Sequence, residues 1–425
     1  MLAKLKQLLK AKDVRNSILF VLGLLVIYRI AAHVPIPGID VIALKDYLQN
    51  NQLLGLLSVF SGGSLQNFSV IMLGVGPYIT ASIILQLMVM IVPKLEALSK
   101  EGEYGQQKIN QYTRILTVPL SFIQAYSYIK LLSNQSGGQL LANMTIYQML
   151  TTIVIITAGT MFLVWLGELI TEKHVGNGVS LIIFAGIVAR VPASIRNTFV
   201  SFDNTMVLNL LIFIAIGLIT IAAVVLMTEG QRNIPVSYAR HMVGTRSVGG
   251  VNTHLPLRVN QAGVIPIIFA VSVILFPSMV AQFFVNSQVA SLANFSHWIL
   301  GVFKNQTIYA IIYFILVFLF TYFYTSVIFK PTQIAENLQK QGGFIPGIRP
   351  GRPTSDYLNS VMNRVILAGA IFLGLIAILP IVVSPLTGIT TFALGGTSLL
   401  IVVSVVIETL KQIDAQLVMR DYEGL

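Results

Sequence analysis

Ten long apolar runs, separated by short polar segments, restrict what this chain can fold into more than any other feature. The runs lie near residues 18–32, 70–92, 115–132, 145–170, 179–191, 205–227, 262–285, 308–329, 365–383 and 392–407. Crossing about 30 Å of hydrocarbon at about 1.5 Å per residue takes roughly 20 apolar residues. Backbone groups inside a bilayer cannot reach water, so they must pair within a helix. The sequence therefore predicts an all-α membrane protein of about ten transmembrane helices.

The composition agrees with this prediction and excludes several other classes. Of 425 residues, 55% are hydrophobic and only 10% are charged, which is too little charge to cover a water-soluble domain of this length. The net charge of +11 could suggest a nucleic-acid partner, but an excess of Lys and Arg in cytoplasmic loops explains it, so we expect no sequence-specific nucleic-acid binding. The chain has no cysteine, which excludes disulfides, thiol catalysis and Cys-ligated metal.

The positions of the basic residues predict the topology. With the N-terminus inside, most of the 27 Lys and Arg residues lie in segments on the cytoplasmic side, and few lie in the opposite loops. The sequence therefore places both termini in the cytoplasm. The basic N-region followed by an apolar run at 18–30 also resembles a signal peptide, but nine further runs follow it, so we expect it to be the first mature helix.

The predicted spans divide the chain into two halves of five helices. Residues 1–16 are basic with leucines at helical spacing, which suits either a helix on the anionic inner leaflet or a simple start-transfer flank. The first half then covers 17–200, the second half 201–410, and a cytoplasmic tail 411–425. Two cytoplasmic loops are long: 229–261 alternates polar and apolar residues like a hairpin, and 330–358 is helix-like at 333–341 before a Gly- and Pro-rich turn. Such basic loops are either docking surfaces for a soluble partner or plain positive flanks.

A short internal repeat suggests how the halves are related. Gly74-Val-Gly-Pro77 in the second run returns as Gly263-Val-Ile-Pro266 in the seventh. Because each half has five spans and five is an odd number, the two copies have opposite orientations. The sequence therefore predicts an inverted repeat whose broken helices line a central pathway. The stretch 53–68 is apolar but too short and glycine-rich to span, so it is either a re-entrant segment or an ordinary packed loop.

The chain lacks the motifs of an energy-coupled pump or an enzyme. It has no Gly-x-x-x-x-Gly-Lys-Ser/Thr phosphate loop and no His-Glu-x-x-His metal site, and its five His residues are scattered. Within the apolar runs or directly beside them, the only acidic residues are Glu168 and Glu408, and both lie near cytoplasmic ends. We therefore expect no catalysis, no cofactor and no metal. The classes that remain are a passive channel and a transport machine driven by another protein. The alternative is an inverted-repeat secondary solute transporter, which would need a polar site at mid-membrane.

Several motifs along the whole chain resemble those of the SecY family, the central subunits of bacterial protein translocases. They are Pro35-Ile-Pro-Gly-Ile-Asp40, Phe60-Ser-Gly-Gly63, Gly74-Val-Gly-Pro-Tyr-Ile-Thr-Ala-Ser82, Trp165-Leu-Gly-Glu168, Gly176-Asn-Gly178, Thr253-His-Leu-Pro-Leu-Arg-Val-Asn260, Ala262-Gly-Val-Ile-Pro266, Pro346-Gly-Ile-Arg-Pro-Gly351 and Gly395-Gly-Thr-Ser-Leu-Leu400. The resemblance implies an hourglass pore between two inverted halves, a passive channel for secretion of unfolded preproteins and for lateral insertion of membrane proteins.

The resemblance also implies the site residues. The aliphatic pore ring would be Val75, Ile79, Val179, Ile183, Ile268 and Ile401. The plug would be the segment of about 57–68, with Leu57, Phe60, Ser61, Gly62, Gly63 and Leu65, and the lateral gate would include Thr80, Gln124, Asn260 and Phe276. Branched apolar side chains are poor hydrogen-bond partners, so a narrow ring of them resists wetting and ion flow.

Partners follow from the same resemblance. It implies a SecE subunit, a SecG subunit, and either the SecA ATPase or a translating ribosome, docked on the cytoplasmic loops at Arg240, Arg246, Arg258, Arg349 and Arg352. Its substrates would be unfolded preproteins and their signal sequences. The location would be the bacterial plasma membrane.

Overall fold

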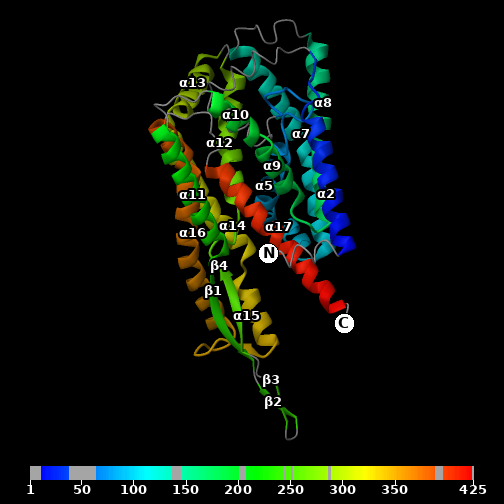
Figure 1. The fold of residues 1–425 in the computed structure, drawn as a ribbon, viewed down its shortest axis with the longest axis vertical. Coiled ribbons are helices and arrows are strands. Elements are labelled where there is room, and N and C mark those ends of the chain that lie inside the picture. Colours follow the sequence, from blue (N-terminus) through cyan, green and yellow to red (C-terminus); the bar gives the residue numbers. More distant parts are fainter. Residues whose placement is uncertain are drawn as a thin grey trace.

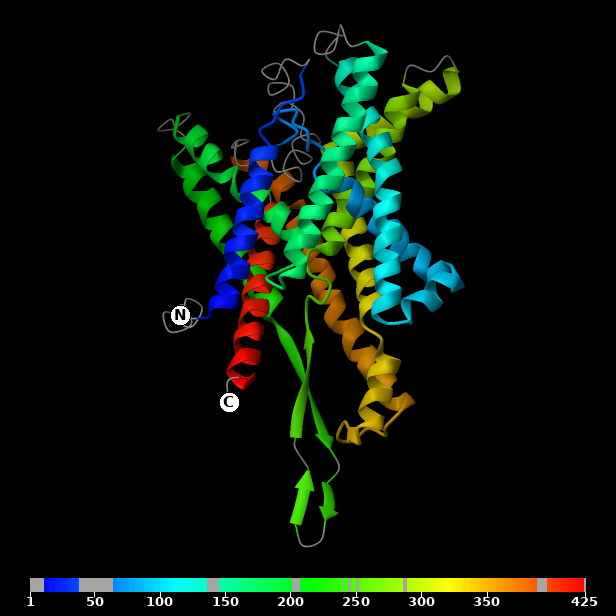
Figure 2. The same ribbon diagram turned by 90° about the vertical axis from the view of Figure 1, so that its right-hand side faces the viewer.

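The protein is a bundle of long helices from which a narrow β-ribbon projects at one end (Figures 1 and 2). The computed structural model describes residues 11–37, 64–135, 145–200, 207–238, 240–243, 246–249, 252–285, 289–387 and 396–423. We refer to the end of the bundle with the ribbon as the sheet end and to the other as the far end.

The two halves of the chain form two sets of helices. The first half contributes α2 (Lys12–Ala31), α5 (Gly76–Ile91), α6 (Pro93–Ser99), α7 (Glu103–Gln135), α8 (Ile146–Glu172), α9 (Gly178–Val188) and α10 (Val191–Val200). The second half contributes α11 (Val207–Glu229), α12 (Ile265–Phe284), α13 (Ala290–Lys304), α14 (Gln306–Ile328), α15 (Pro331–Lys340), α16 (Arg352–Thr387) and α17 (Gly396–Glu423).

Each of the ten apolar runs coincides with one helix, so the helical membrane fold is confirmed. The exact number of spans is not, because the helices differ in length. In the described part of the chain, five helices are long and apolar enough to cross a membrane, and a sixth counts if α5 and α6, bent by 104°, form one span. The helix α9 and the apolar start of α12 are shorter. Short helices such as α6, α10 and α13 were not predicted.

Two helices extend beyond the apolar runs that predicted them. The helix α16 starts at Arg352, inside the loop predicted for 330–358, and α17 continues to Glu423 through the predicted tail. The polar end of α17 contains Lys, Gln and Glu, which have a high helix propensity, and α16 has Pro353 close to its start, where a helix tolerates proline. The part of the N-terminus predicted to be amphipathic lies mostly outside the described residues, and α2 begins at Lys12.

The predicted hairpin is present at the sheet end. Strand β1 (Gln231–Tyr238) pairs antiparallel with β4 (Asn252–Arg258) and with the short β5 (Gly343–Phe344), while β2 (Arg240–Val243) pairs with β3 (Arg246–Gly249) at the tip. The base of the ribbon is held by a small apolar core in which Ile234, Val236 and Leu257 pack with Leu358 and Met362 of α16. The ribbon is therefore fixed to the second half at its base (Figure 2).

The main core lies where the two halves meet. Contacts between α5 and α12, α7 and α12, and α9 and α17 cross from the first half to the second. Outside this core the helices expose large apolar side chains, and only 11% of the apolar window of α11 is buried. An apolar outer surface of this extent is expected where the solvent is lipid.

Candidate functional site

Five of the six aliphatic residues expected in a pore ring are buried in the main apolar cluster of the bundle, and the sixth packs against it. Val75 precedes α5, Ile79 lies in α5, Ile268 in α12 and Ile401 in α17, and all four belong to the main buried cluster. Ile183 of α9 is buried in the same cluster, and Val179 packs against it partly buried. We call these six side chains the aliphatic centre. Residues more than 300 positions apart in the chain thus share one apolar environment.

Matching turns bring α5 and α12 to this centre. Gly74 and Gly263 have nearly the same left-handed backbone, with φ of 59° and 62°. Each is followed by a valine that precedes the helix and by a proline in the first helical turn, where the missing N–H leaves no bond unmade. Left-handed backbone is costly for residues with a Cβ, so glycine is needed at both positions. The sequence repeat is therefore a repeat of backbone geometry.

A close backbone contact supports each of the two turns. In the first half, Gly159 of α8 lies against the carbonyl of Val70, and a Cβ added to Gly159 would stand 2.1 Å from that oxygen. In the second half, Gly369 of α16 lies against the carbonyl of Val259, where the same distance would be 2.9 Å. Val70 and Val259 each stand four residues before the left-handed glycine. The contact is thus present in both halves and tighter in the first.

The helix α9 is positioned by its connection to α8. The side chain of Asn177 accepts a hydrogen bond from Ser180 N–H at 3.1 Å and caps the helix. The Thr171 hydroxyl donates to the Gly167 carbonyl and accepts from Gly178 N–H, both at 2.9 Å. A Cβ on Gly178 would lie 1.8 Å from the Gly167 carbonyl oxygen, so only glycine allows this approach. These contacts fix the position of α9, which carries Val179 and Ile183 of the aliphatic centre.

Three of the four gate residues lie on helices, and Asn260 lies in the segment between β4 and α12. Thr80 of α5 donates to the Gly76 carbonyl, and the Gln124 side chain of α7 lies 4.0 Å from the Cβ position of Gly76. The Asn260 side-chain oxygen is buried without a hydrogen-bond partner among the described residues. Phe276 lies within α12, but its side chain is outside the described part. Since α12 contacts both α5 and α7, these three helices form one boundary between the halves, and Asn260 lies five residues before α12 begins.

Most of the plug segment falls outside the described residues. Leu57, Phe60, Ser61, Gly62 and Gly63 are among those not described. Leu65 is described and is buried in a second apolar cluster with Phe68, Met72 and Ile156. The Ile36 N–H donates to the Phe68 carbonyl at 2.9 Å, and the Val70 N–H donates to the Val34 carbonyl at 3.1 Å, so the segment leading to α5 is fixed.

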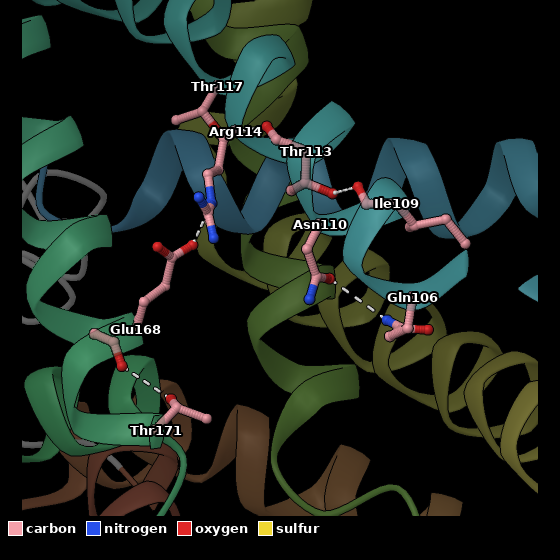
Figure 3. A network of polar contacts seen from close by, with 9 residues as sticks. Gln106, Ile109, Asn110, Thr113, Arg114, Thr117, Glu168 and Thr171 are labelled. Carbon is pink, nitrogen blue, oxygen red and sulfur yellow. Dashed lines mark hydrogen bonds and ion pairs between the residues drawn. The ribbon is translucent and has the colours of Figure 1, made fainter. Parts of the chain in front are cut away.

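An ion pair between α7 and α8 is the main polar feature that the sequence did not reveal. Arg114 Nε lies 2.5 Å from Glu168 Oε1 (Figure 3). Tyr78, in the first turn of α5, lies within electrostatic range of both charges. The sequence places Glu168 near the cytoplasmic end of its run but does not reveal the partner, because Arg114 lies on another helix. A partly buried pair of this kind neutralises both charges beside the apolar core.

The basic residues expected to dock a partner lie at the sheet end. Arg240 and Arg246 lie in β2 and β3, although their side chains are not described, and Arg258 is exposed at the end of β4. Arg349 and Arg352 are exposed beside the turn that follows β5. The Thr354 hydroxyl donates to the Arg349 carbonyl at 2.8 Å, and Ile348 N–H donates to the Ile345 carbonyl at 3.0 Å. This turn therefore presents Arg349 from a fixed backbone.

The fold and the site together define a class of protein. It is a multi-pass helical membrane protein whose two halves meet on an aliphatic centre, and no group of three His, Cys, Asp or Glu suited to a metal occurs in the part of the chain that the structure describes.

Comparison with known proteins identifies the family. The SecY family profile matches residues 69–410. A Protein translocase subunit SecY from Streptomyces galbus is 42% identical over 444 residues, covering 100% of this chain and 99% of the relative. Another from Mycobacterium tuberculosis (strain ATCC 25618 / H37Rv) is 42% identical over 437 residues, covering 98% of each. The chain belongs to the SecY family.

Solved structures share the fold. One, described as the structure of a protein conducting channel, covers 92% of this chain and 90% of its own, with a TM-score of 0.62 at 17% identity. Sec61 in the canine ribosome-channel complex from the endoplasmic reticulum covers the same shares with a TM-score of 0.54 at 16% identity. At these identities the likeness concerns the fold, which is that of a helical membrane channel.

Proposed function

We propose that this chain is the pore-forming subunit of a protein translocase, a passive channel for unfolded preproteins across, and for membrane proteins into, the bacterial plasma membrane. This proposal rests mainly on the aliphatic centre. It is built from α5, α9, α12 and α17, which come from both halves, and its side chains are apolar and branched. A constriction of this chemistry excludes water and ions while making no specific contact with a passing chain. A solute transporter would instead bind its substrate through polar groups.

The roles of the neighbouring segments follow from this proposal. The segment of about 57–68 closes the far side of the constriction as a plug. Signal sequences leave for lipid between α5 and α7 on one side and α12 and α14 on the other, past Thr80, Gln124, Asn260 and Phe276. The buried, unpaired oxygen of Asn260 supports a role here, because such a group gains a hydrogen bond when a polar chain arrives.

Partner proteins supply the driving force for transport. The channel itself is not an enzyme; SecA or a translating ribosome drives transport from the sheet end, which is cytoplasmic, as are both termini. SecE and SecG complete the complex. Exposed arginines on a projecting ribbon and a rigid turn support docking there, since a guanidinium makes charge-assisted, often bidentate bonds with carboxylate or phosphate.

A transport assay with a charge reversal tests this function. Arg349→Glu in the reconstituted complex is expected to abolish SecA-driven entry of a preprotein into vesicles, because it reverses the charge on a fixed turn. Arg364→Glu is the matched control, since Arg364 is also an exposed arginine but lies on α16 outside the turn. Entry of preprotein into protease-protected vesicle lumen is measured for both. Normal transport by the Arg349 variant would show that this turn is not part of the docking surface. A lack of transport by the unsubstituted complex would contradict the proposed function itself.

A further inference from the structure

The helix α13 lies at the far end of the bundle, between α12 and α14 (Figure 1). It contacts both of these helices and projects outward from the bundle in the second view (Figure 2). It is 15 residues long, too short to cross a bilayer.

The surface of α13 is divided into three faces. At 3.6 residues per turn, each residue advances about 100° around the helix. One face is turned toward the protein and contains Ser296, which is buried and bonds to the Leu292 carbonyl. The next face carries Leu292, Phe295 and Trp298, which are 42%, 59% and 65% exposed, and the rings of Phe295 and Trp298 stack at 6.1 Å. The third face carries exposed Asn294 and His297.

The exposed apolar face continues into a surface that faces lipid. A single residue, Asn305, separates α13 from α14, and α14 exposes Ile308, Ile311, Ile315 and Leu319 along one side. These spacings of three and four residues make one stripe along a helix long and apolar enough to span. A helix at the end of such a span, with an apolar face beside a polar face, has the pattern of a helix that lies in the membrane interface.

We propose that α13 inserts its Leu292, Phe295 and Trp298 face into the lipid leaflet at the far end and anchors the ends of α12 and α14 there. Tryptophan favours the interface between lipid and water, because its ring is apolar while its N–H remains near water. The occupant of the face is lipid, at the boundary of headgroup and acyl chain. This inference requires only that the chain spans a membrane, so it is independent of what the channel carries.

The two tryptophans of the chain, Trp165 and Trp298, allow a direct test. In the full complex reconstituted into phosphatidylethanolamine and phosphatidylglycerol bilayers, Trp165→Phe leaves Trp298 as the chain's only tryptophan. Partner subunits are used in tryptophan-free form. We expect Trp298 emission to lose more intensity to a lipid nitroxide near the headgroup than to one near the acyl-chain end, and little to aqueous iodide.

Two neighbouring positions provide the matched controls. In a Trp165→Phe and Trp298→Phe background, Phe295→Trp is expected to repeat the lipid quenching, whereas Asn294→Trp is expected to respond to iodide and little to the nitroxides. Trp298 quenched by iodide but not by lipid would overturn the proposal and place the face in water. Trp298 insensitive to both would also overturn it, since another protein surface would then cover the face.

Discussion

The turns before α5 and α12 have almost the same backbone but unequal surroundings. In the first half, the segment before the turn bonds to residues 34–36, and Gly159 presses against the Val70 carbonyl. In the second half, Val259 N–H likewise donates to the Gly230 carbonyl at 2.9 Å, but the contact of Gly369 with Val259 is looser than that of Gly159 with Val70. Protein interiors are close-packed and transmit strain, so the two halves should respond differently to a methyl group added at this contact.

The largest expected effect on stability comes from adding a methyl group at the tighter of the two contacts, that of Gly159 with Val70. Gly159→Ala places a Cβ against a backbone oxygen that cannot rotate away, so we expect a loss of about 3 kcal/mol, the upper end for overpacking. The better helix propensity of alanine offsets only about 1 kcal/mol. The measurement is the thermal unfolding midpoint in lipid nanodiscs.

Gly369→Ala is the matched variant in the other half. Its Cβ would stand 2.9 Å from a backbone oxygen, so a shift is needed there too, but a smaller one than at Gly159. Helix propensity again offsets part of the cost, and the loss in the midpoint should be clearly smaller than that of Gly159→Ala. Equal losses in both variants would contradict the inequality of the two halves.

A smaller effect is expected from the turn itself. Gly263→Ala keeps open space around the Cβ but forces a left-handed backbone at φ of 62°, so we expect a loss of about 1–2 kcal/mol. Gly217→Ala in α11 is the control, because it has equal space and lies within an ordinary helix. If both variants unfold at the same temperature, backbone strain does not set the turn.

The smallest effect concerns an ion pair in the second half. Lys411 Nζ lies 2.8 Å from Glu229 Oε1 between α17 and α11, and both side chains are more than a third exposed. Solvent screens such pairs, so Lys411→Met should change stability by less than about 1 kcal/mol. Arg114→Met, which leaves the less exposed Glu168 unpaired, should cost more in the same unfolding measurement. A larger loss of stability from Lys411→Met than from Arg114→Met would contradict the view that the first half is held together more tightly than the second.

Patterns along the chain predicted the features that depend on local chemistry. Apolar runs located ten helices, alternation located β1 and β4, and the four-residue repeat located the matching turns at Gly74 and Gly263. The tight contact at Gly159 and the ion pair of Arg114 with Glu168 could not be predicted in this way. Both depend on which helix faces meet, and periodicity within one helix carries no information about its neighbour. The helix α13 was missed because its mixed faces gave no long apolar run.

The aliphatic centre followed from the family resemblance rather than from spacing alone. Val179 and Ile183 are four residues apart, as are many pairs of aliphatic residues that face lipid. What distinguishes them is the Gly178 approach to Gly167, which turns their face inward. That contact between α8 and α9 is visible only in three dimensions.

The most direct test of the account is the ion conductance of reconstituted channels with a polar residue in the aliphatic centre. Ile183→Asn is expected to raise the resting conductance of a planar bilayer, because an amide holds water where a branched side chain excludes it. Ile182→Asn is the control on the same helix, since Ile182 is buried in the same cluster but does not belong to the aliphatic centre. We expect a leak from the Ile183 variant and none from the Ile182 variant. Equal conductance in both inserted variants, whether raised or unchanged, would contradict the claim that these side chains seal a pore between the two halves.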